Sequence, residues 1–210
     1  MELFDNLFHD LTTLWVVIDP VGTLPIFLAA TVGMSAAQAR GTAIRAVIVA
    51  FIILLFFVVA GQLLLTSMDV RLESFEIAGG IVLFLFALTM VFGEPKSEKE
   101  EAALSTSPSD PAIYPLAIPS IAGPGAMLAA VTLTDNSKFN MMEQAETVFQ
   151  IAVVLALTLV LLFAASRIVK LIGTAGVNIV SRVMGLILAS VAVDTIVNAV
   201  RILWPSGGAG

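Results

Sequence analysis

The chain has 210 residues, of which 59% are hydrophobic and only 12% carry a charge, and it contains no cysteine. Soluble domains carry roughly 25% charged residues, about twice as many, and the lack of cysteine excludes disulfides and thiol chemistry. Uncharged runs at 46–65 and 77–92 approach the length that crosses a hydrocarbon core of about 30 Å. The composition predicts an all-α polytopic membrane protein. The sequence has no basic patch of the kind that binds nucleic acid.

Six apolar segments follow one another along the chain, and each is predicted to be a transmembrane helix. They are residues 11–32, 46–65, 75–92, 112–132, 148–168 and 180–203. A polar, acidic stretch at 94–111 separates the third segment from the fourth and has the composition of a flexible linker. The linker divides one transmembrane domain into two three-helix halves, residues 1–93 and 112–210.

The two halves resemble each other in the order of their segments. Each half opens with a segment interrupted by Pro and Gly and continues with a strongly apolar one, and the run at 80–88 corresponds to the run at 185–193. Three spans is an odd number, so the second half must begin on the opposite side of the membrane from the first. The sequence therefore predicts two inverted-topology repeats.

The distribution of basic residues predicts an orientation in the membrane, because cytoplasmic loops carry an excess of Lys and Arg. The side that holds the connections after segments one, three and five carries seven of the ten basic residues: Arg40, Arg45, Lys96, Lys99, Arg167, Lys170 and Arg182. We expect this side, including the linker, to be cytoplasmic and both termini to lie outside.

Two motifs interrupt apolar segments, Asp19-Pro20-Val21-Gly22-Thr23-Leu24-Pro25 in the first and Pro119-Ser120-Ile121-Ala122-Gly123-Pro124-Gly125 in the fourth. Proline removes a helical hydrogen bond and clashes with the preceding turn, so both segments are predicted to be helices broken near their middles. Within a bilayer, such backbone is tolerated only where it is buried in protein or lines a polar cavity. Each break also creates a helix N-terminus that favours an anion and free carbonyls that favour a cation.

This pattern predicts a binding site near mid-membrane for a small zwitterion, with its carboxylate on N–H groups and its ammonium on carbonyls or on Asp19. Glycines at the breaks would let the backbone approach the ligand closely. The candidate substrate-binding residues are Asp19, Pro20, Gly22, Thr23, Pro25, Pro119, Ser120, Gly123, Pro124 and Gly125. The alternative is that Pro and Gly merely kink two helices, but two breaks in corresponding positions favour a site.

Asp19 and Asp194 are the only acids deep inside predicted spans, where a charge costs roughly 3 kcal/mol on insertion scales, so we expect both to be functional. Asp19 could bind an ammonium group, cap a half-helix or carry a proton. Asp194 has Ser190 one turn before it and Asn198 one turn after it, which makes a polar stripe on one helix face. The stripe either lines a coupling or substrate pathway or forms hydrogen bonds between helices, and the sequence favours neither.

The two interrupted motifs resemble those of the MarC family of prokaryotic integral membrane proteins, which includes the small neutral amino acid transporter SnatA. The resemblance extends over nearly all of the chain and is carried by 19–27 and 115–125, with weaker matches at 78–81 and 182–188. It implies six spans in inverted repeats, a place in the inner (plasma) membrane, and transport of amino acids such as glycine and alanine. Relatives commonly have Asn in place of Asp19 and an amide in place of Asp194, so the exact substrate and the coupling ion, H⁺ or Na⁺, stay open.

The sequence is thus interpreted as a secondary active transporter of small neutral amino acids, with no cofactor, no metal site and no enzymatic activity. It has no nucleotide-binding loop, no His-rich metal pattern and no nucleophile motif. Two other functions are compatible with it: a cation carrier or channel with Asp19 and Asp194 as ligands, or a membrane scaffold without a substrate. Hard-cation sites usually gather six or more oxygens, more than two carboxylates supply. Assembly into an oligomer is also compatible with the sequence.

Overall fold

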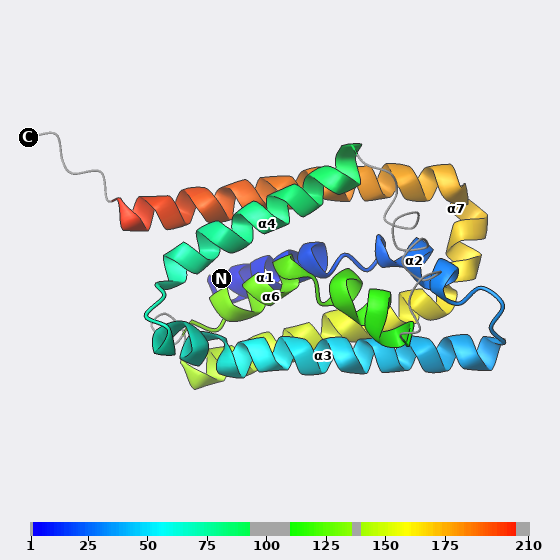
Figure 1. Ribbon diagram of the computed structural model, residues 1–210, viewed down its shortest axis with the longest axis horizontal. Helices are drawn as coiled ribbons and strands as arrows, with labels where there is room; N and C mark the ends of the chain where they lie inside the picture. The colour runs from blue at the N-terminus through cyan, green and yellow to red at the C-terminus, as the bar shows by residue number, and fades with distance from the viewer. Residues whose placement is uncertain (1, 93–109, 136–139, 205–210) are drawn as a thin grey trace, which may run out of the picture.

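The computed structural model describes residues 2–92, 110–135 and 140–204, and every regular element within these ranges is a helix (Figure 1). The helices are α1 (Glu2–Ile18), α2 (Thr23–Ala30), α3 (Ala36–Ser67), α4 (Leu72–Phe92), η1 (Ala112–Ile121), α6 (Pro124–Thr132) and α7 (Met141–Leu203). The predicted all-α fold is therefore confirmed. The predicted linker at 94–111 lies, except for its last two residues, outside the described part of the chain.

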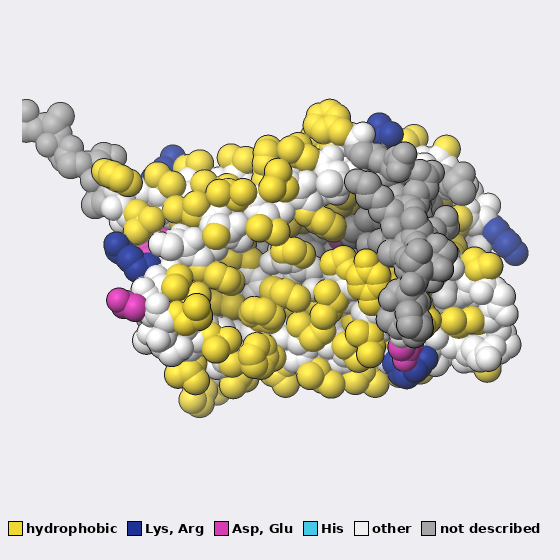
Figure 2. All heavy atoms as spheres, in the orientation of Figure 1, with side chains coloured by type: hydrophobic (Ala, Val, Ile, Leu, Met, Phe, Trp, Pro, Cys, Tyr) yellow, Lys and Arg dark blue, Asp and Glu magenta, His cyan; other side chains and the backbone are white. Residues whose placement is uncertain are grey.

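Five helical stretches within the described residues are long and apolar enough to cross a membrane: Asp10–Ala30, Ala36–Ser67, Leu72–Phe92, Met141–Gly173 and Asn178–Leu203. Helices η1 and α6 pass the same test together and meet at a 58° bend, the geometry of either a sixth, broken span or a re-entrant loop. On the face that Figure 2 shows, apolar side chains cover much of the middle, and most Lys and Arg side chains lie toward the two ends. Both the long apolar helices and this surface pattern are those of an integral membrane protein.

Two helices begin earlier than the apolar pattern predicted, because polar capping boxes extend them beyond the membrane-spanning part. Helix α3 begins at Ala36 rather than at 46, and the Ser35 hydroxyl oxygen accepts a hydrogen bond from the N–H of Gln38 while the Gln38 side chain accepts one from the N–H of Ser35. Helix α7 begins at Met141 rather than at 148, with the same reciprocal pair between Asn140 and Glu143. Each box satisfies amide groups that a helix start leaves open.

The fifth and sixth predicted segments form one long helix, α7, that is bent sharply at Gly173. This glycine has φ 69° and ψ 167°, a left-handed backbone conformation that glycine adopts at little cost. The bend turns the chain back along the molecule, so that the second half of α7 runs beside α4 (Figure 1).

Glycines allow α4 and the second half of α7 to pack backbone against backbone. A Cβ atom at Gly80 would lie 3.2 Å from the carbonyl oxygen of Ala192, and one at Gly185 would lie 3.1 Å from the carbonyl oxygen of Ala87. The contact is reciprocal, because each glycine faces the residue seven positions after the other. Small residues are the usual means by which transmembrane helices approach this closely.

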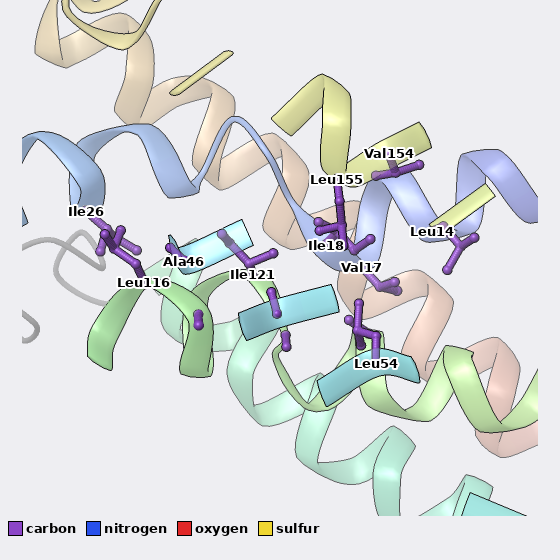
Figure 3. Packing of buried hydrophobic residues seen from close by; sticks show 14 of the residues in the cluster. Leu14, Val17, Ile18, Ile26, Ala46, Leu54, Leu116, Ile121, Val154 and Leu155 are labelled. Atoms are coloured by element: carbon purple, nitrogen blue, oxygen red, sulfur yellow. The ribbon is translucent and has the colours of Figure 1, made fainter. Parts of the chain in front are cut away.

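The first broken span lies at the centre of the molecule. In its apolar window 67% of residues are buried, against 22–39% in the other four continuous spans. Leu14 and Ile18 of α1, Leu54 of α3, Ile121 of η1 and Leu155 of α7 are almost fully buried and meet in one core (Figure 3). Both breaks therefore sit among packed side chains.

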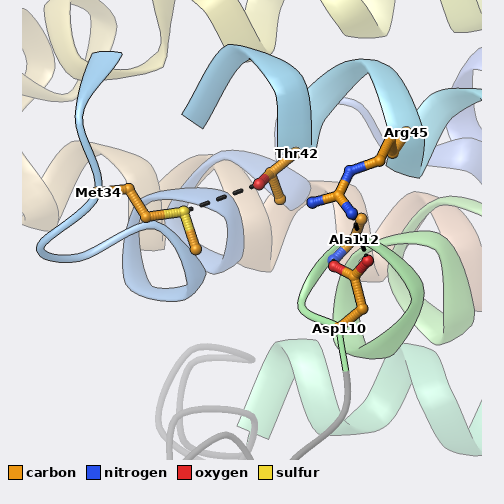
Figure 4. Close-up of polar contacts among 5 residues, drawn as sticks. All are labelled: Met34, Thr42, Arg45, Asp110 and Ala112. Carbon is orange, nitrogen blue, oxygen red and sulfur yellow. Dashed lines mark hydrogen bonds and ion pairs between the residues drawn. The ribbon is translucent and has the colours of Figure 1, made fainter. Parts of the chain in front are cut away.

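A polar contact joins the start of η1 to α3 near one end of the bundle (Figure 4). Arg45 and Asp110 form an ion pair at 2.6 Å, and the other carboxylate oxygen of Asp110 accepts a hydrogen bond from the N–H of Ala112 at 3.0 Å. Both charged side chains are partly exposed, and exposed pairs contribute about 0–1 kcal/mol. The contact positions η1 more than it stabilises the fold.

Candidate functional site

The first break is the four-residue connection between α1 and α2, and it begins at Asp19, whose backbone is not helical. Asp19 has φ 50°, in the left-handed region. Aspartate tolerates this region better than most residues because its short side chain can form local hydrogen bonds. The helix resumes through hydrogen bonds from the N–H of Thr23 to the Asp19 carbonyl, at 3.2 Å, and from the N–H of Leu24 to the Val21 carbonyl, at 3.1 Å.

The carboxylate of Asp19 caps the amino end of α2. Its Oδ1 atom accepts a hydrogen bond from the N–H of Gly22 at 3.0 Å, and the Thr23 hydroxyl donates to the Asp19 carbonyl oxygen at 3.0 Å. A negative charge at a helix N-terminus is stabilised by the helix dipole. Of the three roles that the sequence left open for Asp19, the cap is present in this conformation, and ammonium binding and proton transfer stay predictions.

The second break separates η1 from α6, and prolines shape both of its sides. Tyr114 and Ile118, each followed by proline, have extended backbone angles inside the π-helical η1, as the residue before proline usually does. Helix α6 then begins with Pro124, at a first position where the missing N–H has no helical partner to lose. The N-cap residue of α6 is Gly123, which has no side chain to cap the helix. The two breaks therefore differ in the residues before the second helix: the Asp19 carboxylate accepts the N–H of Gly22 before α2, whereas α6 is preceded by Gly123 and begins with Pro124.

The two breaks touch each other inside the core. The Ser120 hydroxyl donates a hydrogen bond to the Thr23 hydroxyl oxygen at 3.0 Å, and these side chains are 3% and 0% exposed. Around this contact α1 packs beside α6 and α2 beside η1, so the broken helices run antiparallel (Figure 1). Two motifs about a hundred positions apart in the chain thus form one buried polar locus.

The glycines of both breaks have protein atoms where a side chain would start. A Cβ atom would lie 2.0 Å from Oδ2 of Asp19 at Gly22, 2.7 Å from the Pro119 carbonyl oxygen at Gly123, and 2.6 Å from Cδ1 of Leu83 at Gly125. These glycines permit close packing of the breaks in the observed conformation. The prolines complete the set: Pro20 is buried, and half-buried are Pro25, Pro119 and Pro124.

The polar stripe on α7 lies apart from the breaks. Ser190, Asp194 and Asn198 are all exposed on the outer face of the helix, where the Asn198 side-chain amide donates a hydrogen bond to Oδ2 of Asp194 at 3.1 Å. Beside them runs a groove of about 480 Å³, to which Phe84 of α4 also contributes, and none of its lining residues belongs to either break. The observed fold does not bring the stripe and the breaks into one site.

Sequence reasoning missed several buried polar residues near the α3–α4 end of the bundle. Asp135 is 5% exposed and accepts a hydrogen bond from the Gln62 side chain at 2.9 Å, beside a cavity of about 570 Å³. Glu76, on the face of α4 that also carries Gly80, is 9% exposed. Polar residues near segment ends are expected at an interface, so the pairing of Gln62 with Asp135 has no local sequence signal. The face that Glu76 shares with Gly80 was an available signal for its burial.

Five long apolar helices and the bent pair of η1 and α6, with two breaks in contact through buried hydroxyl groups, define a polytopic integral membrane protein with discontinuous helices. The model of the MarC family of integral membrane proteins matches residues 4–204, and the chain belongs to this family. The resemblance drawn from the two motifs is therefore confirmed.

Similar proteins occur in bacteria and archaea. The chain is 35% identical over 193 residues to the inner membrane protein YhgN of Escherichia coli K12, covering 91% of this chain and 93% of that protein. It is 32% identical over 214 residues to the membrane protein YvbG of Bacillus subtilis, covering 97% and 98%. A membrane protein of Archaeoglobus fulgidus is 34% identical over 195 residues, covering 89% and 88%. These names describe membrane proteins and state no substrate, and no solved structure matches the chain.

Proposed function

We propose that the protein is a secondary active transporter of small neutral amino acids, of the glycine and alanine type, and not an enzyme. The substrate is held near mid-membrane between the two broken helices. The observation that carries the proposal is the buried contact between the breaks, Ser120 to Thr23 at 3.0 Å. Discontinuous helices that meet in the membrane core are the usual framework of transporter sites.

The difference between the two breaks predicts how a zwitterion is oriented in the site, with its carboxylate toward α6 and its ammonium toward Asp19. The N-cap residue of α6 is Gly123, which offers no side-chain cap of its own, and the first N–H groups of the helix, at Gly125 and Ala126, suit the substrate carboxylate. The amino end of α2 already carries the Asp19 carboxylate, which together with released carbonyl oxygens suits the ammonium group. A neutral amino acid with a small side chain matches both ends without adding charge to the core.

Transport requires the site to open, because the observed conformation is closed around it. Asp19, Thr23 and Ser120 are 1%, 0% and 3% exposed, so protein atoms surround them on all sides. In this proposal one three-helix half moves against the other to admit the substrate from alternate sides. The antiparallel broken helices and the reciprocal contacts of Gly80 and Gly185 support an inverted-repeat arrangement of those halves.

The proposal includes an orientation and leaves the coupling ion to experiment. In this proposal η1 and α6 together cross the membrane as a sixth span, which puts both termini on one side. We assign that side to the outside of the inner membrane because the other side holds most of the Lys and Arg residues. Either H⁺ or Na⁺ is compatible as the driving ion, with Asp19 as its carrier or ligand.

Uptake into liposomes tests the function. The reconstituted protein is given labelled glycine or alanine with and without a proton or sodium gradient, alongside Asp19→Asn and a control variant, Asp69→Asn. Asp69 is an exposed aspartate that also has a left-handed backbone, φ 55°. We expect saturable uptake by the wild type and the control, and reduced or gradient-independent uptake by Asp19→Asn.

Each rival function predicts a different result in the same assay. Cation flux without amino-acid flux would replace the proposal by a cation carrier or channel. No flux of either kind from a folded, correctly inserted protein would favour a scaffold.

A further inference from the structure

A polar stripe crosses the outer surface of the second half of α7 inside the membrane. Ser190, Asp194 and Asn198 are exposed, and Asp194 lies nine residues before Leu203, where the helix ends. At 1.5 Å per residue its backbone lies about 14 Å from the helix end. The candidate span Asn178–Leu203, centred on a hydrocarbon core of about 30 Å, would hold this position within the core. Lipid chains offer no hydrogen-bond partners there, and acids at such depths almost always face protein or water.

The stripe satisfies only part of its own hydrogen-bonding capacity. Asn198 donates one side-chain N–H to Oδ2 of Asp194 at 3.1 Å, and the Ser190 hydroxyl donates to the Leu186 carbonyl oxygen at 3.0 Å. An asparagine amide has a second N–H and a carbonyl oxygen, and a carboxyl group has a second oxygen. Within the described part of the chain no hydrogen bond engages these remaining groups of Asp194 and Asn198.

A groove runs beside the stripe and could accommodate the side chains of a partner helix. Its volume is about 480 Å³, and its apolar walls include Phe84 from α4 and Leu186, Val193 and Val197 from α7. A partner helix could place a ridge of side chains in the groove and its polar groups against the stripe. The face therefore combines apolar packing surface with unsatisfied donors and acceptors at one depth.

We propose that this face binds a second copy of the chain, giving a dimer about a twofold axis parallel to the membrane normal. Any partner must present polar groups at the depth of Asp194, and a second copy inserted in the same orientation does so by symmetry. The groups are also chemically self-complementary: the spare N–H of Asn198 on one copy is a donor for the spare oxygen of Asp194 on the other, and the reverse pair forms by the twofold symmetry. Hydrogen bonds between polar side chains associate transmembrane helices in this way. The proposal goes beyond transport and does not depend on it.

Cysteine cross-linking locates the interface, since the natural chain has no cysteine. Single variants Ser190→Cys, Val193→Cys and Val197→Cys probe the face. The control is Phe56→Cys in α3, where Phe56 is 51% exposed. A disulfide forms only where Cα atoms come within about 7 Å. With a mild oxidant in liposomes we expect a cross-linked dimer from at least one probe and none from the control. No adduct above the control level at any of the three positions would overturn the proposal.

A second measurement tests the stripe itself. The wild type, Asp194→Asn and the double variant Asp194→Leu/Asn198→Leu are labelled and their dimerisation in liposomes is followed by single-molecule photobleaching at increasing dilution. The leucines face outward, so the monomer should keep its helicity and elution profile. We expect roughly tenfold weaker dimerisation of the double variant, the scale of one or two interhelical hydrogen bonds, and little change for Asp194→Asn. A monomeric wild type, or a double variant that dimerises as the wild type does, would contradict the dimer.

Discussion

Replacing Gly22 by alanine should destabilise the first break through a single added atom. The new Cβ would lie 2.0 Å from Oδ2 and 2.7 Å from Cγ of Asp19, far inside contact distance. The Asp19 side chain is short and its backbone is held at φ 50°, so the carboxylate must rotate away. In doing so it loses the hydrogen bond at 3.0 Å from the N–H of Gly22.

The expected cost follows from that hydrogen bond. A hydrogen bond to a charged group contributes about 1.5–3 kcal/mol, and the Asp19 side chain is only 1% exposed, so bulk solvent does little to offset the lost donor. Position 22 is the N-cap of α2, where alanine has no advantage over glycine. We therefore expect Gly22→Ala to lower the free energy of unfolding by about 2 kcal/mol.

Tryptophan fluorescence can follow this loss at the break itself. The chain has two tryptophans, and Trp15 lies one turn before Asp19, whose N–H donates to the Trp15 carbonyl at 3.1 Å. Trp204→Phe removes the other, which is 80% exposed, so that unfolding in mixed micelles reports on Trp15 alone. The control is Gly41→Ala in α3, where a Cβ meets nothing within 4 Å. If Gly22→Ala unfolds at the same denaturant concentration as the parent, the assigned cap is wrong.

Two further substitutions test the packing that holds the breaks and the long helices together. Ser120→Ala should cost about 1 kcal/mol, and combining it with Thr23→Val should be non-additive in a double-mutant cycle, because the two hydroxyls share one hydrogen bond. Additive costs would show that the hydroxyls do not interact. Gly80→Ala places a Cβ 2.6 Å from Ile196 and 3.2 Å from the Ala192 carbonyl, so denaturant unfolding should show a loss of about 1–3 kcal/mol from overpacking. A stability equal to that of the parent would show that α4 and α7 are packed less closely than observed.

The membrane spans and both breaks were predictable because their signals are local. Apolar runs report the bilayer, and the prolines and glycines at 20–25 and 119–125 interrupt helices wherever they occur. The helix starts at Ala36 and Met141 also have local sequence signals, the capping boxes of Ser35 with Gln38 and of Asn140 with Glu143. A prediction based on apolar runs alone does not detect these polar caps. Only the cap signals could have extended those segments.

The contacts within the candidate site were not predictable from the chain alone. The hydrogen bond from Ser120 to Thr23 depends on how two distant segments pack, and so does the pairing of Gln62 with Asp135. Periodicity placed Ser190, Asp194 and Asn198 on one face of a helix, yet nothing in the sequence says whether that face points into the bundle or away from it. The fold resolves this, and the outward direction of the stripe is what motivates the dimer.

The central claim is that the two breaks form a site for a small neutral amino acid, and counterflow in liposomes tests it most directly. Counterflow needs no ion gradient, so its outcome does not depend on the coupling ion. Liposomes preloaded with unlabelled alanine should accumulate external labelled alanine well above empty liposomes, and preloading with the larger leucine should drive far less accumulation. Equal labelling of preloaded and empty liposomes, with the protein folded and inserted, would contradict the account.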